Sequence, residues 1–200
     1  MRALVVDSRV AEEVIAKRRS LGHDILDEIW DGVWHILPPH TVEHQRVVGD
    51  VLFALMTAVE GAGLGLVIHQ LNVADPVKGM DDLRIPDVSV VLKTGHALVL
   101  EPYIAGGPDF LVEVRSPNDE TNEKLPWYAM QGVREALVID QDTKGLELYR
   151  LHGGALVRVA SSPGVVESQV VPLRFEQVQR QGKPGLLITH VADLAKRWEI

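Results

Sequence analysis

Two acidic residues lie in apolar segments that are typical of buried strands: Asp87 in Ile-Pro-Asp-Val-Ser-Val-Val and Glu113 in Phe-Leu-Val-Glu-Val-Arg. A carboxylate is costly to bury unless it is paired or bound to a metal. If the two acids converge, they form an oxygen-rich site for a hard cation, Mg²⁺ or Mn²⁺, and the Val114 carbonyl can add a third oxygen. The alternative is that each acid ends a strand and pairs with Arg84 or Arg115.

A second candidate site is the segment His40-Thr41-Val42-Glu43-His44, which matches the H-x-x-E-H motif of zinc peptidases. Two histidines four residues apart on a helix can bind zinc. Pro38-Pro39 directly precede this segment, so we expect His40 to lie in an extended lead-in, outside the helix and away from the pocket. Thr41 is the expected helix cap, which leaves His44 alone to face the pocket from the third helical position.

The expected elements that position these residues alternate between helices and strands. We predict helices over 10–21, from Thr41 to about residue 60, over 122–131 with Asn122 as cap, and from Thr189 onward. Strands are expected at 24–30, 33–37, 66–73, 85–92, 110–115, 135–140 and 145–151, and short strands and turns over 155–188. The Asp31-Gly32 pair indicates a hairpin. This order predicts an α/β fold, mixed with α+β character, around one sheet.

The remaining glycine-rich and acidic stretches are assigned no chemistry. Gly61 to Gly65 follows a helix and precedes a strand, the reverse of the order in dinucleotide-binding sites, so no organic cofactor is expected. The acidic pairs Asp81-Asp82 and Asp119-Glu120 are expected in solvated loops.

Composition limits the class of protein. The chain has 200 residues, of which 46% are hydrophobic and 24% charged, and we expect a single domain over 1–200. There is no cysteine, which excludes disulfides and thiolate sites. No apolar run reaches the ~20 residues of a membrane span, and no signal peptide is evident, so a cytoplasmic protein without membrane contact is expected. The net charge of −8 disfavours a broad basic surface for nucleic acid.

Three groups of residues together resemble one known family. They are Arg84-Ile85-Pro86-Asp87-Val88, the segment from Gly107 to Pro117, and Glu123-Lys124-Leu125 followed by Tyr128, Ala129, Gly132 and Val133. Their order and spacing resemble the Uma-type family of restriction-endonuclease-like proteins, within the PD-(D/E)xK nuclease superfamily. The resemblance covers about residues 28–150 and includes the Asp31-Gly32 hairpin.

The resemblance implies a restriction-endonuclease-like core, a mixed sheet flanked by helices, with extra hairpins. It implies a metal-dependent endonuclease that hydrolyses phosphodiester bonds of DNA, with Mg²⁺ or Mn²⁺ at Asp87 and Glu113. Lys124 matches a lysine that the family carries on the helix after the strand, and His44 matches a histidine on the early helix, with Glu43 beside it as a further candidate. A member that cuts duplex DNA is expected to act as a homodimer.

Two alternatives remain open from the residues. Arg115 occupies the x-K position two residues after Glu113 and competes with Lys124 for the role of site cation. The chain as a whole can also be a non-catalytic binding or scaffold protein on the same fold, or a zinc peptidase that uses His40, Glu43 and His44.

Overall fold

The centre of the fold is a six-stranded mixed sheet, seen here in a computed structural model that describes residues 8–117 and 119–200. Its strand order is β12-β11-β10-β9-β6-β3. The bounds are β3 Gly65–His69, β6 Val88–Leu92, β9 Phe110–Arg115, β10 Glu135–Asp140, β11 Leu146–His152 and β12 Ala155–Ser161. Only β9 and β10 are parallel within this sheet, because helix α3 (Thr121–Met130) connects them as a crossover.

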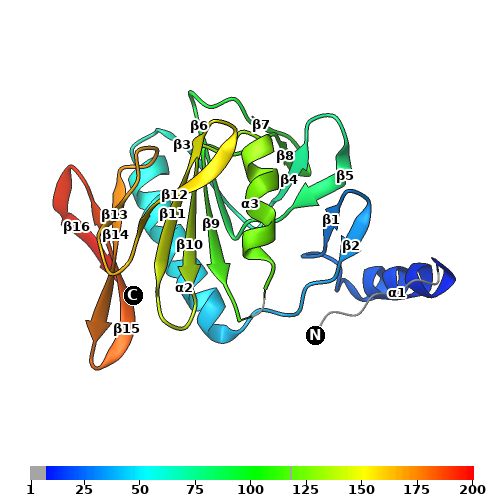
Figure 1. Cartoon of the computed structure of the whole chain (residues 1–200), viewed down its shortest axis with the longest axis horizontal. Coiled ribbons are helices and arrows are strands. Elements are labelled where there is room, and N and C mark those ends of the chain that lie inside the picture. The colour runs from blue at the N-terminus through cyan, green and yellow to red at the C-terminus, as the bar shows by residue number, and fades with distance from the viewer. Residues whose placement is uncertain (1–7, 118) are drawn as a thin grey trace.

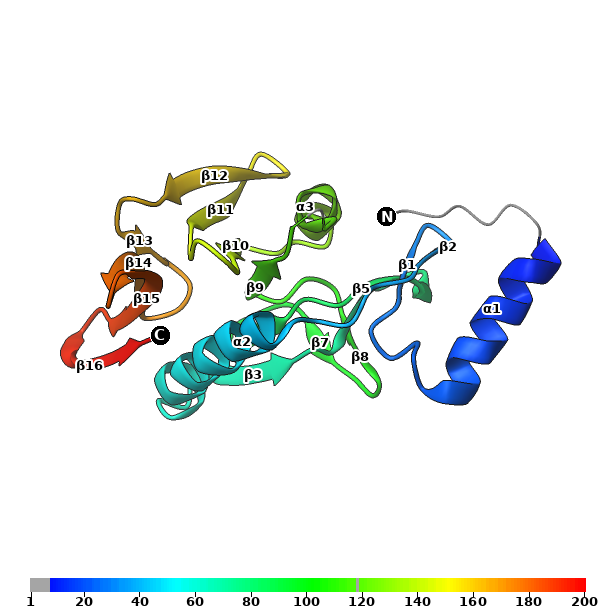
Figure 2. The same ribbon diagram turned by 90° about the horizontal axis from the view of Figure 1, so that it is seen from below.

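Two helices cover opposite faces of this sheet (Figure 2). Helix α2 (Val42–Leu55) continues as one π-helical segment, η1 (Met56–Glu60), and packs on the face that includes Val112 and Val114 of β9. Helix α3 packs on the other face, which includes Leu111. Because side chains alternate along a strand, Glu113 shares the α3 face with Leu111. Both helices begin at the end of the sheet to which β9 and β10 point (Figure 1).

A second sheet flanks the first and has the order β2-β1-β5-β4-β8-β7. Its strands are β1 Glu28–Trp30, β2 Val33–His35, β4 Asn72–Asp75, β5 Gly79–Arg84, β7 Leu98–Val99 and β8 Tyr103–Ala105. The hairpin between β1 and β2 turns through Asp31 and Gly32, both with positive φ (48° and 81°), as a type I′ turn requires. Helix α1 (Ser8–Leu21) lies beyond this sheet, at one end of the molecule (Figure 2).

The third sheet contradicts the prediction of a C-terminal helix. It has the order β13-β14-β15-β16, with β13 Val166–Glu167, β14 Leu173–Arg180, β15 Lys183–His190 and β16 Asp193–Glu199. The segment after Thr189 is therefore the end of β15 and an antiparallel strand paired with it. Trp198 and Ile200, two residues apart, both pack on the main core, which is the two-residue alternation of a strand and not the spacing of a helix.

Three local expectations were also wrong. The strand expected at 66–73 divides at Gln70, whose φ is 46°, into β3 and β4, which belong to different sheets. Asp82 lies in β5 and is buried, where it accepts hydrogen bonds from Arg84 and from Trp127 Nε1. The region 155–188 contains three long strands besides one short one. In each case pairing or packing between elements, which propensity alone does not reveal, decides the structure.

Of the other predicted elements, three strands are shorter than expected: 24–30 is reduced to Glu28–Trp30, 33–37 to Val33–His35 and 85–92 to Val88–Leu92. Helices α1, α2 and α3 and strands β9, β10 and β11 lie within one or two residues of their expected positions. The mixed α/β class is confirmed as well, but within the described residues the strands form three sheets rather than the expected single one. Residues of β14 and β15 share one hydrophobic core with α2 and the central sheet. This shared core favours a single domain over 1–200, which stays a prediction. Within the described residues, no helix is both long and apolar enough to cross a membrane.

Candidate metal centre

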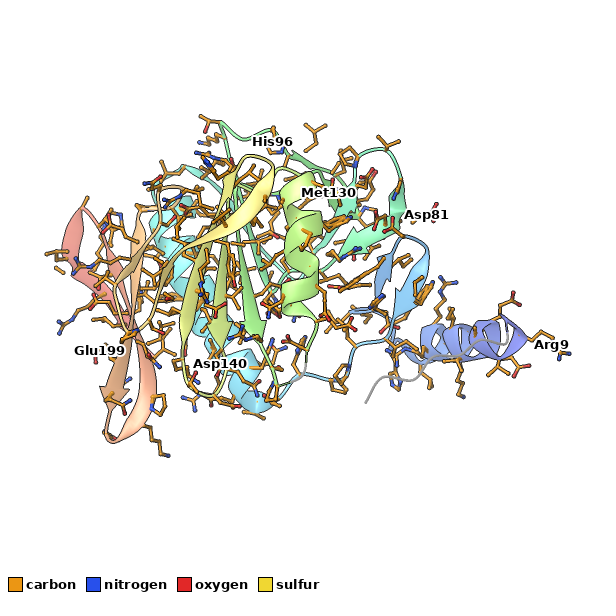
Figure 3. All side chains as sticks on the ribbon, in the orientation of Figure 1. Arg9, Asp81, His96, Met130, Asp140 and Glu199 are labelled. Carbon is orange, nitrogen blue, oxygen red and sulfur yellow. The ribbon has the colours of Figure 1, made fainter. Side chains whose placement is uncertain are left out.

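The predicted site residues gather around a pocket of about 240 Å³ at the end of the central sheet where α2 and α3 begin. Asp87, Glu113, Val114, Lys124 and His44 all line it. Figure 3 shows Asp140, the last residue of β10, at this end of the sheet. The pocket is therefore built by strand ends from one side and helix starts from two others.

The start of α2 fixes His44. Thr41 is the N-cap, as predicted, and its Oγ1 accepts a hydrogen bond from the His44 backbone N–H at 3.1 Å. His44 is 2% exposed, and its Nε2 lies 3.4 Å from Asp87 Oδ2. Its other ring nitrogen, Nδ1, is buried without a hydrogen-bond partner.

Asp87 precedes β6 directly, and β6 pairs with β9 so that Val88 lies opposite Val112. This register brings the Asp87 carboxylate to the backbone N–H of Val114, which donates to Oδ2 at 2.7 Å. Burial alone would raise the pKa of Asp87, but the contacts with His44 and the Val114 N–H outweigh it and hold that pKa below its usual value. Asp87 is therefore a buried anion.

Glu113 has the opposite electrostatic character. Burial raises its pKa to about 8, and the nearby carboxylates of Asp87 and Glu28 act in the same direction, against the lowering effect of Lys124. Tyr128 donates its hydroxyl to Glu113 Oε1 at 2.6 Å. Glu113 therefore favours its protonated form at neutral pH.

Lys124 joins the two carboxylates Glu113 and Glu28. Its Nζ lies 2.8 Å from Glu28 Oε1 and 3.3 Å from Glu113 Oε1. Burial alone would lower the pKa of Lys124, but the two acids outweigh it and raise that pKa. Helix α3 begins at Thr121 with Glu120 at the N-cap, so the expected cap at Asn122 was wrong by two residues. Lys124 nevertheless turns inward rather than to solvent.

Two residues of the site were missed in the sequence. Glu28 is fully buried, and besides Lys124 it accepts hydrogen bonds from Trp30 Nε1 and the Ile85 N–H, both at 2.8 Å. It comes from the flanking sheet, so no local spacing relates it to Lys124. Tyr128 stands four residues after Lys124 on α3, and that helical spacing is a signal that could have found it.

Two secondary candidates do not reach the pocket. The half-exposed Glu43 side chain pairs with Lys144 Nζ at 2.6 Å and is not among the pocket residues. Arg115 also lies outside the lining and bridges Asp140 and Glu147, at 3.9 and 3.5 Å. Lys124, and not Arg115, is therefore the cation at Glu113.

His40 corrects one expectation. It lies outside α2, as predicted, but it lines the pocket, and its ring stacks on that of His44 with centroids 4.0 Å apart. The reason is that Pro38 and Pro39 form the pocket wall, so the extended lead-in runs along the pocket. Burial and then His44 lower the pKa of His40. Ligand atoms of His40, His44 and Asp87 lie within 4.8 Å of one another, which makes these three a possible metal site.

The chain is similar to known proteins in sequence and in fold. Residues 18–179 match the family Uma2, described as "Putative restriction endonuclease". A crystal structure of a "putative nuclease belonging to DUF820" from Anabaena variabilis ATCC 29413 is similar in fold, with a TM-score of 0.57 and 17% identity over 71% of this chain and 80% of that one. No curated protein matches the chain. Since the family match spans most of its length, the chain belongs to the Uma2 family.

Proposed function

We propose that the chain is a metal-dependent endonuclease that hydrolyses phosphodiester bonds of DNA. The observation that carries the proposal is the gathering of Asp87, Glu113 and Lys124 in one pocket, from two neighbouring strand ends and one helix start. Two acids and a lysine in this arrangement can hold a cation and offset the charge of a phosphate. The family to which the chain belongs is described as "Putative restriction endonuclease", and this description supports the same class of reaction.

The donor set fits Mg²⁺ or Mn²⁺. The carboxylates of Asp87 and Glu113 and the carbonyl of Val114 would hold the ion, since hard cations prefer oxygen ligands. The buried acids Glu28, Asp87 and Glu113 have one ammonium among them, that of Lys124, and a bound cation would take the place of the proton that Glu113 holds at neutral pH. When bound, such an ion stabilises negative charge on phosphate oxygens and makes water more acidic.

The side chains supply the remaining chemistry. Lys124 is a compact positive charge that can contact a phosphate oxygen or orient the attacking water. Glu28 keeps the ammonium in place, at 2.8 Å, when Glu113 changes its protonation state. Tyr128 orients the Glu113 carboxyl group. His44 and the Val114 N–H both contact Oδ2 of Asp87 and so hold its carboxylate in place.

A non-catalytic binding protein on the same fold is the second candidate. The net charge of −8 favours it, because a protein that grips a DNA duplex normally offers basic surface. A zinc peptidase is not proposed, since Glu43, the acid of the motif, pairs with Lys144 outside the pocket.

A nuclease assay separates the two candidates. Supercoiled plasmid and single-stranded DNA are incubated with the parent protein and Mg²⁺ or Mn²⁺, because a single nick relaxes the supercoil. We expect cleavage by the parent and none by Asp87→Asn. Asp50→Asn is the matched control, an exposed aspartate on α2 outside the pocket that should cut like the parent. Equal cleavage by parent and Asp87→Asn would indicate a contaminant, and no cleavage at all would favour the binding protein.

The proposal includes a homodimer, because cutting both strands of a duplex in one binding event requires two sites. Light scattering in solution measures the mass directly. A mass near twice the 22.1 kDa of the chain supports concerted cleavage of both strands, whereas a monomer would cut one strand at a time.

A further inference from the structure

One cluster in the pocket has a chemistry that the magnesium proposal does not use. His40 and His44 present two imidazoles beside Asp87, and their ligand atoms lie within 4.8 Å of one another. Mg²⁺ prefers oxygen ligands, whereas imidazole favours zinc, iron, cobalt or nickel. Two imidazoles and one carboxylate are therefore the wrong donors for Mg²⁺ and suitable donors for a transition metal.

We propose that His40, His44 and Asp87 form a binding site for a divalent transition-metal ion of the Zn²⁺ or Co²⁺ type, which shares Asp87 with the carboxylate site for Mg²⁺ or Mn²⁺.

The spacing of the donors supports this site. His44 Nε2 lies 3.4 Å from Asp87 Oδ2, which is longer than an ordinary hydrogen bond. Two ligands on one tetrahedral ion, each about 2.1 Å from it, are separated by about 3.4 Å. The pair therefore has the separation that a shared ion would impose.

The environment of His44 is an independent observation. Its ring is 2% exposed, yet Nδ1 has no hydrogen-bond partner. A histidine kept for structure normally satisfies both ring nitrogens once it is buried. His44 therefore lacks the two hydrogen-bond partners expected of a structural histidine, which leaves Nε2 available as a metal ligand beside Asp87.

His40 completes the set from the wall of the pocket. Its ring stacks on His44 at 4.0 Å with an interplanar angle of 12°. It is only half buried and lies outside α2, so its side chain can adjust to an ion while the backbone of α2 stays in place. Three protein ligands leave at least one coordination position open to water or an anionic ligand.

The charge of the pocket favours the same conclusion. The Lys124 ammonium pairs with Glu28 and Glu113. Among the described residues, the ion-pair contact of the buried Asp87 carboxylate is with the imidazole of His44 and not with an ammonium. A divalent cation at the imidazoles would neutralise that carboxylate, which reduces the cost of its burial.

Titration with Co²⁺ tests this site without any nuclease substrate, since Co²⁺ bound by nitrogen and oxygen ligands absorbs visible light. We expect one Co²⁺ per parent chain, displaced by Zn²⁺ but not by excess Mg²⁺. His40→Ala should weaken Co²⁺ binding by at least ~10-fold, the scale on which supporting groups alone affect metal affinity. His44→Ala should weaken Co²⁺ binding in the same way. If His44→Ala does not fold, His40→Ala alone tests the site.

Two control variants identify the ligands. His152→Ala removes an exposed histidine outside the pocket and should leave Co²⁺ binding unchanged. Glu113→Gln should also leave it unchanged while abolishing cleavage, because Glu113 belongs only to the carboxylate site. Co²⁺ binding that resists His40→Ala, or that Glu113→Gln removes, would overturn the proposal. Because Co²⁺ absorption is read without DNA, the inference can stand where the nuclease proposal fails, and the reverse.

Discussion

Removal of the Lys124 ammonium is the sharpest test of the charge arrangement in the pocket. In Lys124→Ala, Glu28 loses its partner at 2.8 Å and Glu113 its partner at 3.3 Å. Removing one member of a buried ion pair costs about 3–5 kcal/mol, because the other charge stays buried without compensation. For a chain of this size that corresponds to a fall in Tm of about 6–20 °C.

The effect should depend on pH, and the direction follows from Glu113. Its pKa in the folded protein is about 8, above the usual 4.5, so the folded state binds more protons between these values. The stability of the parent therefore falls as pH rises from 4.5 through 8. Without Lys124 the ionised form of Glu113 loses its nearest positive charge. The difference in Tm between parent and Lys124→Ala should thus be larger at about pH 9 than at about pH 6.

Thermal melting followed by circular dichroism at the two pH values measures this difference. Glu113→Gln should remove much of the pH dependence, and adding it to Lys124→Ala should restore part of the lost stability. Lys196→Ala is the control, because its exposed pair with Asp193 at 3.8 Å should contribute less than about 1 kcal/mol. Two results would refute the assignment of charges. One is the same Tm for parent and Lys124→Ala at both pH values, and the other is a larger difference in Tm at the lower pH than at the higher pH.

Three further variants test the surrounding contacts. Glu28→Gln leaves Lys124 held by Glu113 alone, and we expect turnover to fall by about 10–100-fold while Mn²⁺ affinity, measured by calorimetry, changes little. Arg115→Ala should retain the turnover of the parent and lower stability by at most about 1 kcal/mol, since Arg115 bridges partly exposed acids outside the pocket; an inactive Arg115→Ala would contradict this. Asp82→Ala should lower the free energy of unfolding in urea by about 1–3 kcal/mol, because Arg84 and Trp127 Nε1 lose a buried acceptor.

The parts of the site that sequence could predict are those that local pattern determines. The run Phe110 to Arg115 is buried on both faces and is apolar enough to identify β9. Thr41 is followed by a helical apolar pattern, so the cap and the inward direction of His44 follow from neighbouring residues. These two elements fix Glu113 and His44, and the register of β6 on β9 then brings Asp87 to them.

The parts that failed depend on pairing and packing between elements. Glu28 lies in β1, and its contact with Lys124 requires the flanking sheet to pack against α3, which no local pattern encodes. The segment that ends in Trp198 has apolar spacing compatible with a helix, but it becomes a strand because β15 is beside it. His40 was excluded from the pocket on its helix boundary alone. The boundary was right, but the path of the chain before the helix, along the pocket wall, was not predictable from the prolines.

The cost of the pocket is itself an argument that it serves a function. Glu28, Glu113 and Lys124 are buried at the junction of two sheets and one helix, where apolar side chains of similar volume would stabilise the fold at least as well. A fold kept for stability alone would not retain this cluster beside a second buried acid and an imidazole without a hydrogen-bond partner. Because Glu28 comes from the β1–β2 hairpin, the flanking sheet takes part in the site rather than only covering it. The hairpin and α3 must therefore stay packed together for Lys124 to face Glu113, which makes the position of the lysine a property of the whole junction and not of α3 alone.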